Sequence, residues 1–145
     1  GLKNTVEVKR YNDQITIYYP ATSQVDSIET QKDIKRAIIE ILRFEAKQHL
    51  IPKTYELANK CGFNVNKVFV KDLKSRWGSC SSQNNINLNI HLMRLPEHLS
   101  DFIILHELCH TVYKNHGPHF HNLLNKLVGN EKVMNKELRK YNILL

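Results

Sequence analysis

Histidine is concentrated in one short stretch of this 145-residue chain, with a spacing that suits a metal site. Five of the eight histidines fall between His106 and His121, and residues 106–110 form the motif HELCH, which has the form HExxH. On a helix, side chains four residues apart lie one turn apart, with Cβ atoms about 5 to 6 Å from each other, so two imidazoles can bind one Zn²⁺. Glu107 lies beside them, where its carboxylate can take a proton from the water that such an ion activates.

A single HExxH motif can be accidental, and two histidines on a helix can also have a solvated or capping role. Two further features favour metal binding here. The apolar run at 102–105 precedes the motif, so its histidines emerge from a buried helix, where imidazoles without partners are costly. A third histidine, His116, follows His110 by six residues, just beyond a helix break at Asn115 and Gly117. His116 is therefore predicted to be the third ligand, which leaves one tetrahedral position open for water.

Other polar residues near the motif have less defined roles. His119 and His121 flank Phe120 in the next predicted helix, so they are expected to face water or support the site rather than bind the ion. Cys109 is a candidate ligand or redox switch, but a small buried packing residue is favoured at that helical position. Tyr113 is a candidate donor to an oxyanion, with no geometry in the sequence to test it.

The segments around the motif predict an α+β fold, with strands before residue 91 and helices after it. Alternating apolar and polar residues indicate one hairpin over 5–10 and 14–19, with a turn at Asn12-Asp13, and a second over 76–80 and 86–90. A further strand is expected over 67–73. A small mixed or antiparallel sheet is expected to pack against the HExxH helix.

Helical periodicity and stop signals predict five helices. The first is expected over 27–50, ended by Pro52, and a shorter one over 52–60, stopped by Gly62. The HExxH helix is expected to begin at Pro96 and to run to 113 or 114. The last two are expected from Pro118 to Gly129 and over 131–141.

Composition narrows the class of protein. The net charge of +7 divides into +4 over residues 1–74 and +3 over 75–145, so no basic block exists and at most weak nucleic-acid contact is expected.

No apolar run approaches the roughly 20 residues of a membrane span, so no membrane partner is predicted. Three widely spaced cysteines form no disulfide framework, which favours a reducing compartment, the cytoplasm. The oligomeric state is left open.

Four sequence segments together resemble the YgjP-like metallopeptidase family, which belongs with the SprT-like and other small zincins. They span about residues 68–127 and read KSRWGSCSS over 74–82, INLN over 86–89, HELCH over 106–110 and NHGPHF over 115–120. The resemblance implies a single zincin-like metallopeptidase domain over 1–145. The first 60 residues match only loosely, which leaves open whether an upstream portion of the family domain is missing.

The resemblance also implies the roles of individual residues. His106, His110 and His116 would bind one Zn²⁺ per chain, and Glu107 would be the general base. The tryptophan-containing hairpin resembles the strand pair beside the cleft, where an edge strand holds an extended peptide or protein substrate through backbone groups. Three residues of that hairpin are candidates for positioning the substrate: Arg76, Trp77 and Ser79. For Trp77 a place in the core, and for Arg76 a surface salt bridge, are the alternatives.

The leading hypothesis is a zinc-dependent hydrolase, most simply a peptidase. A metal-dependent nucleotide phosphohydrolase is a second hypothesis, in which Lys74 and Arg76 would hold the nucleotide, although no glycine-rich phosphate loop supports it. A nonenzymatic, zinc-stapled nucleic-acid-binding module is a third. Glu107 argues against that module, because a structural zinc is closed by four protein ligands and has no use for a general base.

Overall fold

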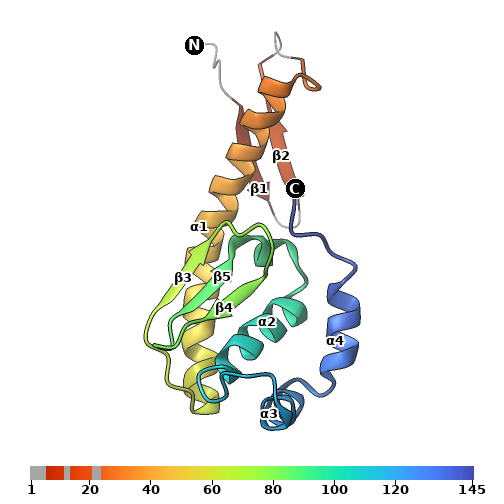
Figure 1. Ribbon diagram of the computed structural model, residues 1–145. Coiled ribbons are helices and arrows are strands. Elements are labelled where there is room, and N and C mark those ends of the chain that lie inside the picture. Colours follow the sequence, from red (N-terminus) through yellow and green to blue (C-terminus); the bar gives the residue numbers. More distant parts are fainter. Residues whose placement is uncertain (1–5, 12–13, 21–23) are drawn as a thin grey trace. The chain divides into compact units, whose positions relative to one another are not determined.

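The computed structural model describes residues 6–11, 14–20 and 24–145, and the chain divides into two compact units, Gly1–Phe44 and Glu45–Leu145 (Figure 1). In the first unit, β1 (Glu7–Tyr11) and β2 (Gln14–Tyr18) pair antiparallel, with Val8 opposite Ile17. The first predicted hairpin is therefore confirmed. Its predicted turn at 12–13 and its first residue, at position 5, lie outside the described residues.

One long helix, α1 (Ile28–Cys61), replaces the two helices predicted over 27–50 and 52–60. The prediction that Pro52 ends the first helix is wrong, because Pro52 lies inside α1. A stripe of buried side chains at four-residue spacing, namely Ala46, Leu50, Thr54 and Ala58, continues across the proline. Pro52 itself is exposed on another face, where water can satisfy the carbonyl that lost its N–H partner. Gly62 has a φ of 78° just after the helix, as a left-handed cap requires.

The second unit contains a three-stranded mixed sheet with the order β3-β5-β4. The strands are β3 (Val68–Lys71), β4 (Gly78–Cys80) and β5 (Ile86–Asn89), with β5 parallel to β3 and antiparallel to β4. The second predicted hairpin is confirmed, and Asn84 in its turn has a φ of 61°. Each strand is shorter than predicted. A 3-10 helix, η1 (Ile90–Arg94), follows β5 directly and was not predicted.

The HExxH motif lies at the end of α2 (Glu97–Cys109). This helix ends about four residues before the predicted 113 or 114. The chain tightens there into three-residue turns, in which the His110 and Thr111 N–H groups donate to the carbonyls of Glu107 and Leu108 at 3.1 and 3.0 Å. His110 is therefore the C-cap of α2 rather than an interior residue.

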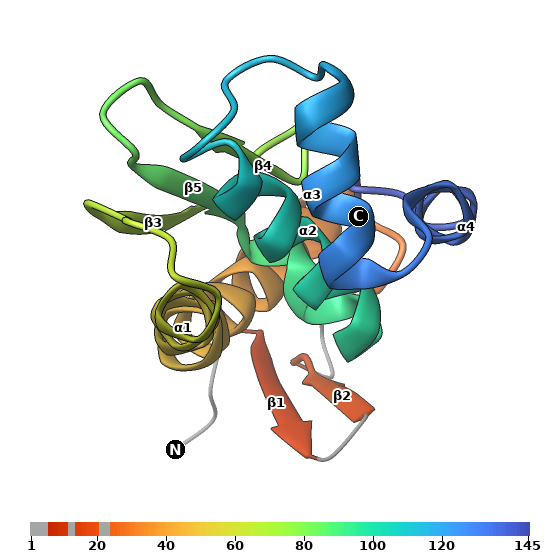
Figure 2. The same cartoon turned by 90° about the horizontal axis from the view of Figure 1, so that it is seen from below.

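Two helices complete the unit, α3 (Pro118–Val128) and α4 (Glu131–Leu138). Both were predicted, and α4 ends three residues early. The sheet contacts α2 through β4 and β5, and α3 contacts α2 on another side, so that α2 lies between them (Figure 2). Its inward residues, including Phe102, Ile104 and Leu108, are almost fully buried. The α+β prediction, with a small mixed sheet on the HExxH helix, is confirmed. No helix in the described ranges is both long and apolar enough to cross a membrane.

Candidate active site

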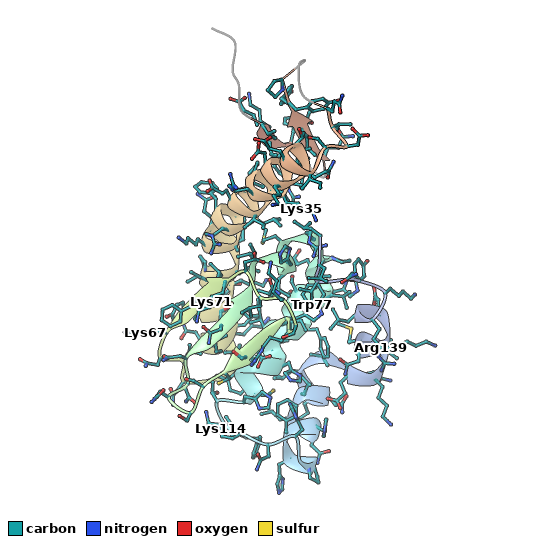
Figure 3. All side chains as sticks on the ribbon, turned by 45° about the horizontal axis from the view of Figure 1, so that its top comes forward. Lys35, Lys67, Lys71, Trp77, Lys114 and Arg139 are labelled. Atoms are coloured by element: carbon teal, nitrogen blue, oxygen red, sulfur yellow. The ribbon has the colours of Figure 1, made fainter. Side chains whose placement is uncertain are left out.

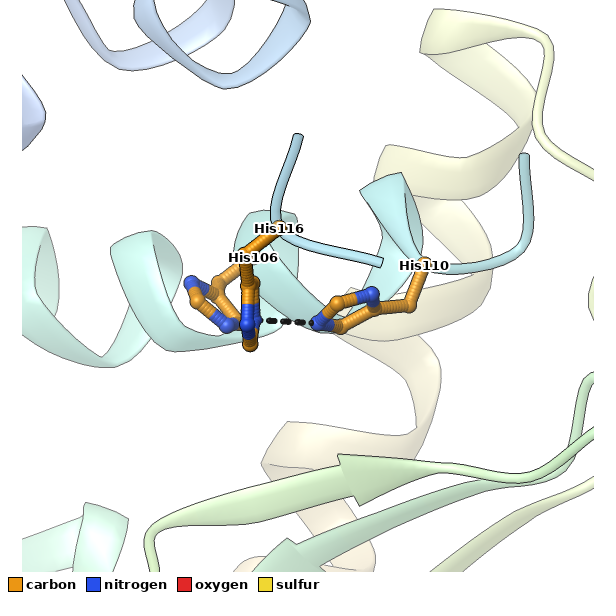
Figure 4. A group of neighbouring side chains, drawn as sticks. All are labelled: His106, His110 and His116. Carbon is orange, nitrogen blue, oxygen red and sulfur yellow. Dashed lines mark hydrogen bonds between the residues drawn. The ribbon is translucent and has the colours of Figure 1, made fainter. Parts of the chain in front are cut away.

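The three predicted histidine ligands lie together, although they come from two different segments. His106 and His110 project from the end of α2, and His116 comes from the loop that precedes α3 (Figure 4). One ligand atom from each residue lies within 4.8 Å of the other two. The ring centroids are 4.6 to 5.3 Å apart. The arrangement could hold one metal ion.

Phe120 packs against all three imidazoles. Its buried ring stacks on His110 with centroids 4.5 Å apart, and lies edge-on to His106 and His116 at 5.0 and 4.9 Å. Gly117 and Pro118 start α3 immediately after His116, which sets Phe120 on the first turn beneath the cluster. The family-like segment over 115–120 includes Phe120, but the sequence did not indicate that its ring packs against the histidines.

Hydrogen bonds determine which nitrogen of His110 is available. Its Nδ1 lies 2.9 Å from the backbone carbonyl of Tyr113, and a carbonyl can only accept, so Nδ1 carries the proton. Its Nε2 then carries a lone pair, and it lies within hydrogen-bond distance of His116 Nε2, at 2.9 Å (Figure 4). A bond from the second ring nitrogen to a carbonyl is the usual way in which a metal-binding histidine is oriented.

Burial shifts the protonation of two groups in the motif. Loss of water, and the neighbouring histidines, lower the pKa of His106 to about 4, so its imidazole is neutral at pH 7, the form that a metal needs. Burial also raises the pKa of Glu107 to about 7, against the opposing positive charge of Arg76. A carboxyl group with a pKa near neutrality is suited to exchanging protons.

The backbone of β4 approaches Glu107 closely at Gly78. A Cβ at this position would lie 3.2 and 3.3 Å from Glu107 Cγ and Oε2, and 3.1 Å from the carbonyl oxygen of Asn87. Only glycine fits there without displacing the carboxylate or the strand. Sequence reasoning missed this role for Gly78, although a glycine within a strand is a signal for close backbone approach.

A cavity of about 440 Å³ contains the histidine cluster and Glu107. Its other lining residues belong to the hairpin and to the loop after α2, namely Gly78, Ser79, Cys80, Ser82 and Lys114. The Lys114 ammonium group donates to the Ser81 carbonyl at 3.1 Å and to the Asn84 side chain, which ties the loop to the hairpin turn. No motif in the sequence indicated this role for Lys114.

The three predicted substrate-positioning residues do not line a single cavity. Ser79 lines the cavity with the histidines. Arg76 is exposed and acts on Glu107 through its charge. Trp77 is half-buried and lines a different cavity.

The two extra histidines and Cys109 do not join the three clustered imidazoles, although the ring of His121 lies 6.3 Å from that of His116. His119 is exposed and stacks on Tyr113 with centroids 5.7 Å apart, and His121 pairs with Glu131. Cys109 is fully buried, as expected of a packing residue, and burial raises the pKa of its thiol to about 12. Neither histidine belongs to the group of side chains that could hold an ion.

Comparisons with known proteins agree with this geometry. The crystal structure of the metallopeptidase zymogen jannalysin from Methanocaldococcus jannaschii superposes with a TM-score of 0.53 and 26% sequence identity, over 60% of this chain and 90% of that one. No curated protein matches the sequence. The family model of the YgjP-like metallopeptidase domain matches residues 3–141, and the chain therefore belongs to this family of metal-dependent peptidases.

Proposed function

We propose that the chain is a zinc peptidase in which His106, His110 and His116 hold a single ion. The convergence of three imidazole nitrogens within 4.8 Å, beside a buried glutamate and in one cavity, carries the proposal. The donor set fits zinc, because neutral imidazoles are preferred zinc ligands and three of them leave an open position. The neutral state of His106 and the oriented ring of His110 support the same assignment.

Glu107 is proposed as the general base. When bound, zinc would act as a Lewis acid that polarises the carbonyl of the scissile bond and lowers the pKa of the attacking water. Glu107 then accepts the proton of that water and passes it to the amine that leaves. Its pKa of about 7 favours both transfers, and the lack of a side chain at Gly78 leaves space for the carboxylate beside β4.

An extended peptide is the proposed substrate. Among the described strands, β4 pairs only with β5 and forms the edge of the sheet, and all three of its residues line the cavity. The free edge of β4 would hold a peptide through backbone hydrogen bonds. Ser79 would contact the bound chain from the strand, and Arg76, which does not line the cavity, would act on Glu107 through its charge.

The nucleotide phosphohydrolase hypothesis has less support at this site. Lys114 is the lining lysine of the cavity, and the Ser81 carbonyl and Asn84 already hold its ammonium group. Lys74 and Arg76, the two cations that the hypothesis assigned to a nucleotide, do not line this cavity. A peptidase requires no such cluster of cations.

Replacement of Glu107 by Gln tests the function. The amide keeps the shape of the carboxylate but cannot accept a proton, so cleavage of an unstructured protein such as casein should fall by about 10² to 10⁴-fold. Zinc content, measured by elemental analysis, should stay at one ion per chain. Control variant Glu137→Gln alters a carboxylate on α4 that pairs with His98 at 2.8 Å, and should retain full activity. Normal turnover by the Glu107 variant would remove this residue from the mechanism.

A further inference from the structure

A second cavity, of about 740 Å³, lies next to the proposed substrate-binding strand. One wall is the segment that leads into β4, including Lys74 and Trp77, and the opposite wall is the end of α4 with the chain that follows it, including Arg139 and Lys140 (Figure 3). Trp77 lines this cavity and the next residue, Gly78, lines the cavity of the histidines. Consecutive residues at the start of β4 therefore line the two cavities.

A polar network centred on the buried His91 bonds to the C-terminal wall. Arg94 donates to the carbonyls of Asn142, at 2.9 Å, and Ile143. The Arg94 guanidinium is held in turn by His91, whose Nδ1 accepts from Arg94 Nε at 3.0 Å, and His91 Nε2 lies 2.9 Å from an oxygen of Asp72. Because His91 is almost fully buried, this chain of bonds holds the wall in place before any ligand arrives.

The charged side chains that line this cavity are all positive. Lys74, Arg139 and Lys140 line it, and no aspartate or glutamate among the described residues does. Lys74 has a carboxylate partner outside the lining, Asp72 at 3.4 Å. Within the described part of the chain, Arg139 and Lys140 make no ion pair. The field inside the cavity therefore favours an anionic group, and the aromatic ring of Trp77 supplies apolar contact beside it.

A peptide bound along β4 would reach this cavity. An extended chain rises about 3.3 Å per residue, so a few residues carry it from the histidine cluster past Gly78 to Trp77. At that point a side chain of the peptide can enter the space between Trp77 and Arg139. Pairing of the peptide with β4 would therefore determine which of its side chains reaches the cavity.

We propose that this cavity is a specificity subsite that takes an aspartate or glutamate side chain of the peptide substrate, a few residues from the scissile bond on the side of Trp77. Arg139 and Lys140 supply the unpaired cations, and the Asp72–His91–Arg94 network keeps their wall in position. This inference rests on the proposed peptidase function, and it adds a substrate class.

The test measures binding, so that it does not depend on turnover. Fluorescent dodecapeptides that carry one Glu at successive positions, and their Gln counterparts, are titrated by anisotropy into the full-length, zinc-loaded Glu107→Gln protein. At one or two adjacent positions, Glu should bind roughly five- to tenfold more tightly than Gln, and 0.5 M salt should remove the difference. The double variant Arg139→Gln/Lys140→Gln should lose this preference and still bind the Gln peptides.

The matched control is Lys132→Gln/Lys136→Gln, which removes two positive charges from α4 at exposed positions outside the cavity. It should keep the Glu preference. Equal binding of Glu and Gln peptides at every position would overturn the subsite. Equal loss in both double variants would also overturn it, because the preference would then reflect net charge.

Two more measurements distinguish a peptide subsite from a nucleic-acid site and from failure of the peptidase function. Mass spectrometry of the peptides after cleavage by the unmodified zinc-loaded chain tests the proposed function itself, and failure to cleave would sink that function independently of the anisotropy result. A labelled single-stranded oligonucleotide is titrated into the same variants. If Arg139→Gln/Lys140→Gln weakens binding of the oligonucleotide and leaves binding of the peptides unchanged, the cavity binds nucleic acid and the peptide subsite is wrong.

Discussion

Two groups of histidine in the Glu45–Leu145 unit, each with one buried member, His91 and His110, differ in the partners of their ring nitrogens. His91 has protein partners on both sides, Asp72 at Nε2 and Arg94 at Nδ1. In the HExxH cluster, His110 Nδ1 donates to the Tyr113 carbonyl and its Nε2 lies 2.9 Å from His116 Nε2, and among the described residues no carboxylate forms an ion pair with the three histidines. His91 is thus bonded to side chains of other types, whereas the cluster brings only imidazole nitrogens together.

This difference separates a structural histidine from a ligand more sharply than burial does. His91 is 3% exposed and His110 is 9% exposed, so exposure alone would rank His91 as the stronger candidate for a special role. Imidazole nitrogens that face one another compete for protons, whereas a metal ion can bind the lone pair of each ring. The comparison therefore predicts different responses. Variants of the cluster should lose zinc, and variants of the His91 network should have a lower free energy of unfolding.

The largest expected effect is at His116. His116→Ala removes one of three proposed ligands and should lose most of the bound zinc, whereas His119→Ala and His121→Ala should keep one ion per chain. Elemental analysis of the three purified variants measures this directly. His119 and His121 are the matched controls, because each lies within five residues of His116 and has its own partner, Tyr113 or Glu131. Full zinc occupancy in His116→Ala would disprove the assignment.

The next effect is at Asp72. Asp72→Asn replaces the acceptor of the His91 hydrogen bond and should lower the free energy of unfolding by about 1 to 3 kcal/mol, since it leaves buried polar groups poorly paired. Zinc content should not change. Urea titration gives the free energy, and Asp33→Asn, at an exposed pair with Arg36, is the control, with an expected change within about 0.5 kcal/mol. If Asp72→Asn lost zinc and kept its free energy of unfolding, the His91 network would support the metal site and not the stability of the fold, and the prediction would be wrong.

The sequence predicts the HExxH cluster but does not predict the His91 network. The HExxH spacing is local, and a helix at 97–109 is enough to bring its histidines together, so their convergence could be predicted. The His91 network joins residues up to 49 positions apart, such as Arg94 and Ile143, and no local spacing encodes such contacts. The same limit explains Pro52, because the buried stripe that keeps α1 continuous depends on packing against residues distant in sequence.

A smaller effect is expected at Gly78, where the strand meets Glu107. Gly78→Ala should lower kcat roughly tenfold, because a Cβ 3.2 Å from Glu107 Cγ and 3.1 Å from the Asn87 carbonyl oxygen requires the carboxylate or the strand to shift, a misplacement that we expect to cost about 1.4 kcal/mol. KM and zinc content should stay near their original values, which separates displacement of the base from damage to the fold. Gly117→Ala is the control, because a Cβ there meets nothing within 4 Å and its φ is −85°. A normal kcat in Gly78→Ala would show that the contact does not position Glu107.

The smallest expected effect is on the pH dependence of stability, and it sharpens the comparison at His91. Burial, followed by the charge of Arg94, lowers the pKa of His91, although Asp72 opposes the shift. The folded chain therefore takes up this proton at lower pH than the unfolded chain, whose histidines titrate near 6.5. Above pH 6.5 the contribution of neutral His91 to stability is complete, and it is lost as the pH falls below that value.

Urea titrations between pH 7 and pH 5 should therefore show a shallower loss of stability in His91→Gln than in the original chain. The pKa of Asp72 is itself lowered below 3.8, so Asp72 stays ionised throughout this window. Burial lowers the pKa of His106 and His110 in the same direction, and their contribution cancels when the two proteins are compared at equal zinc loading. Exposed His49 is the control, because His49→Gln should leave the slope unchanged. Identical slopes for His91→Gln and the original chain would mean that His91 binds its proton equally well in both states, and that its network does not hold a neutral imidazole.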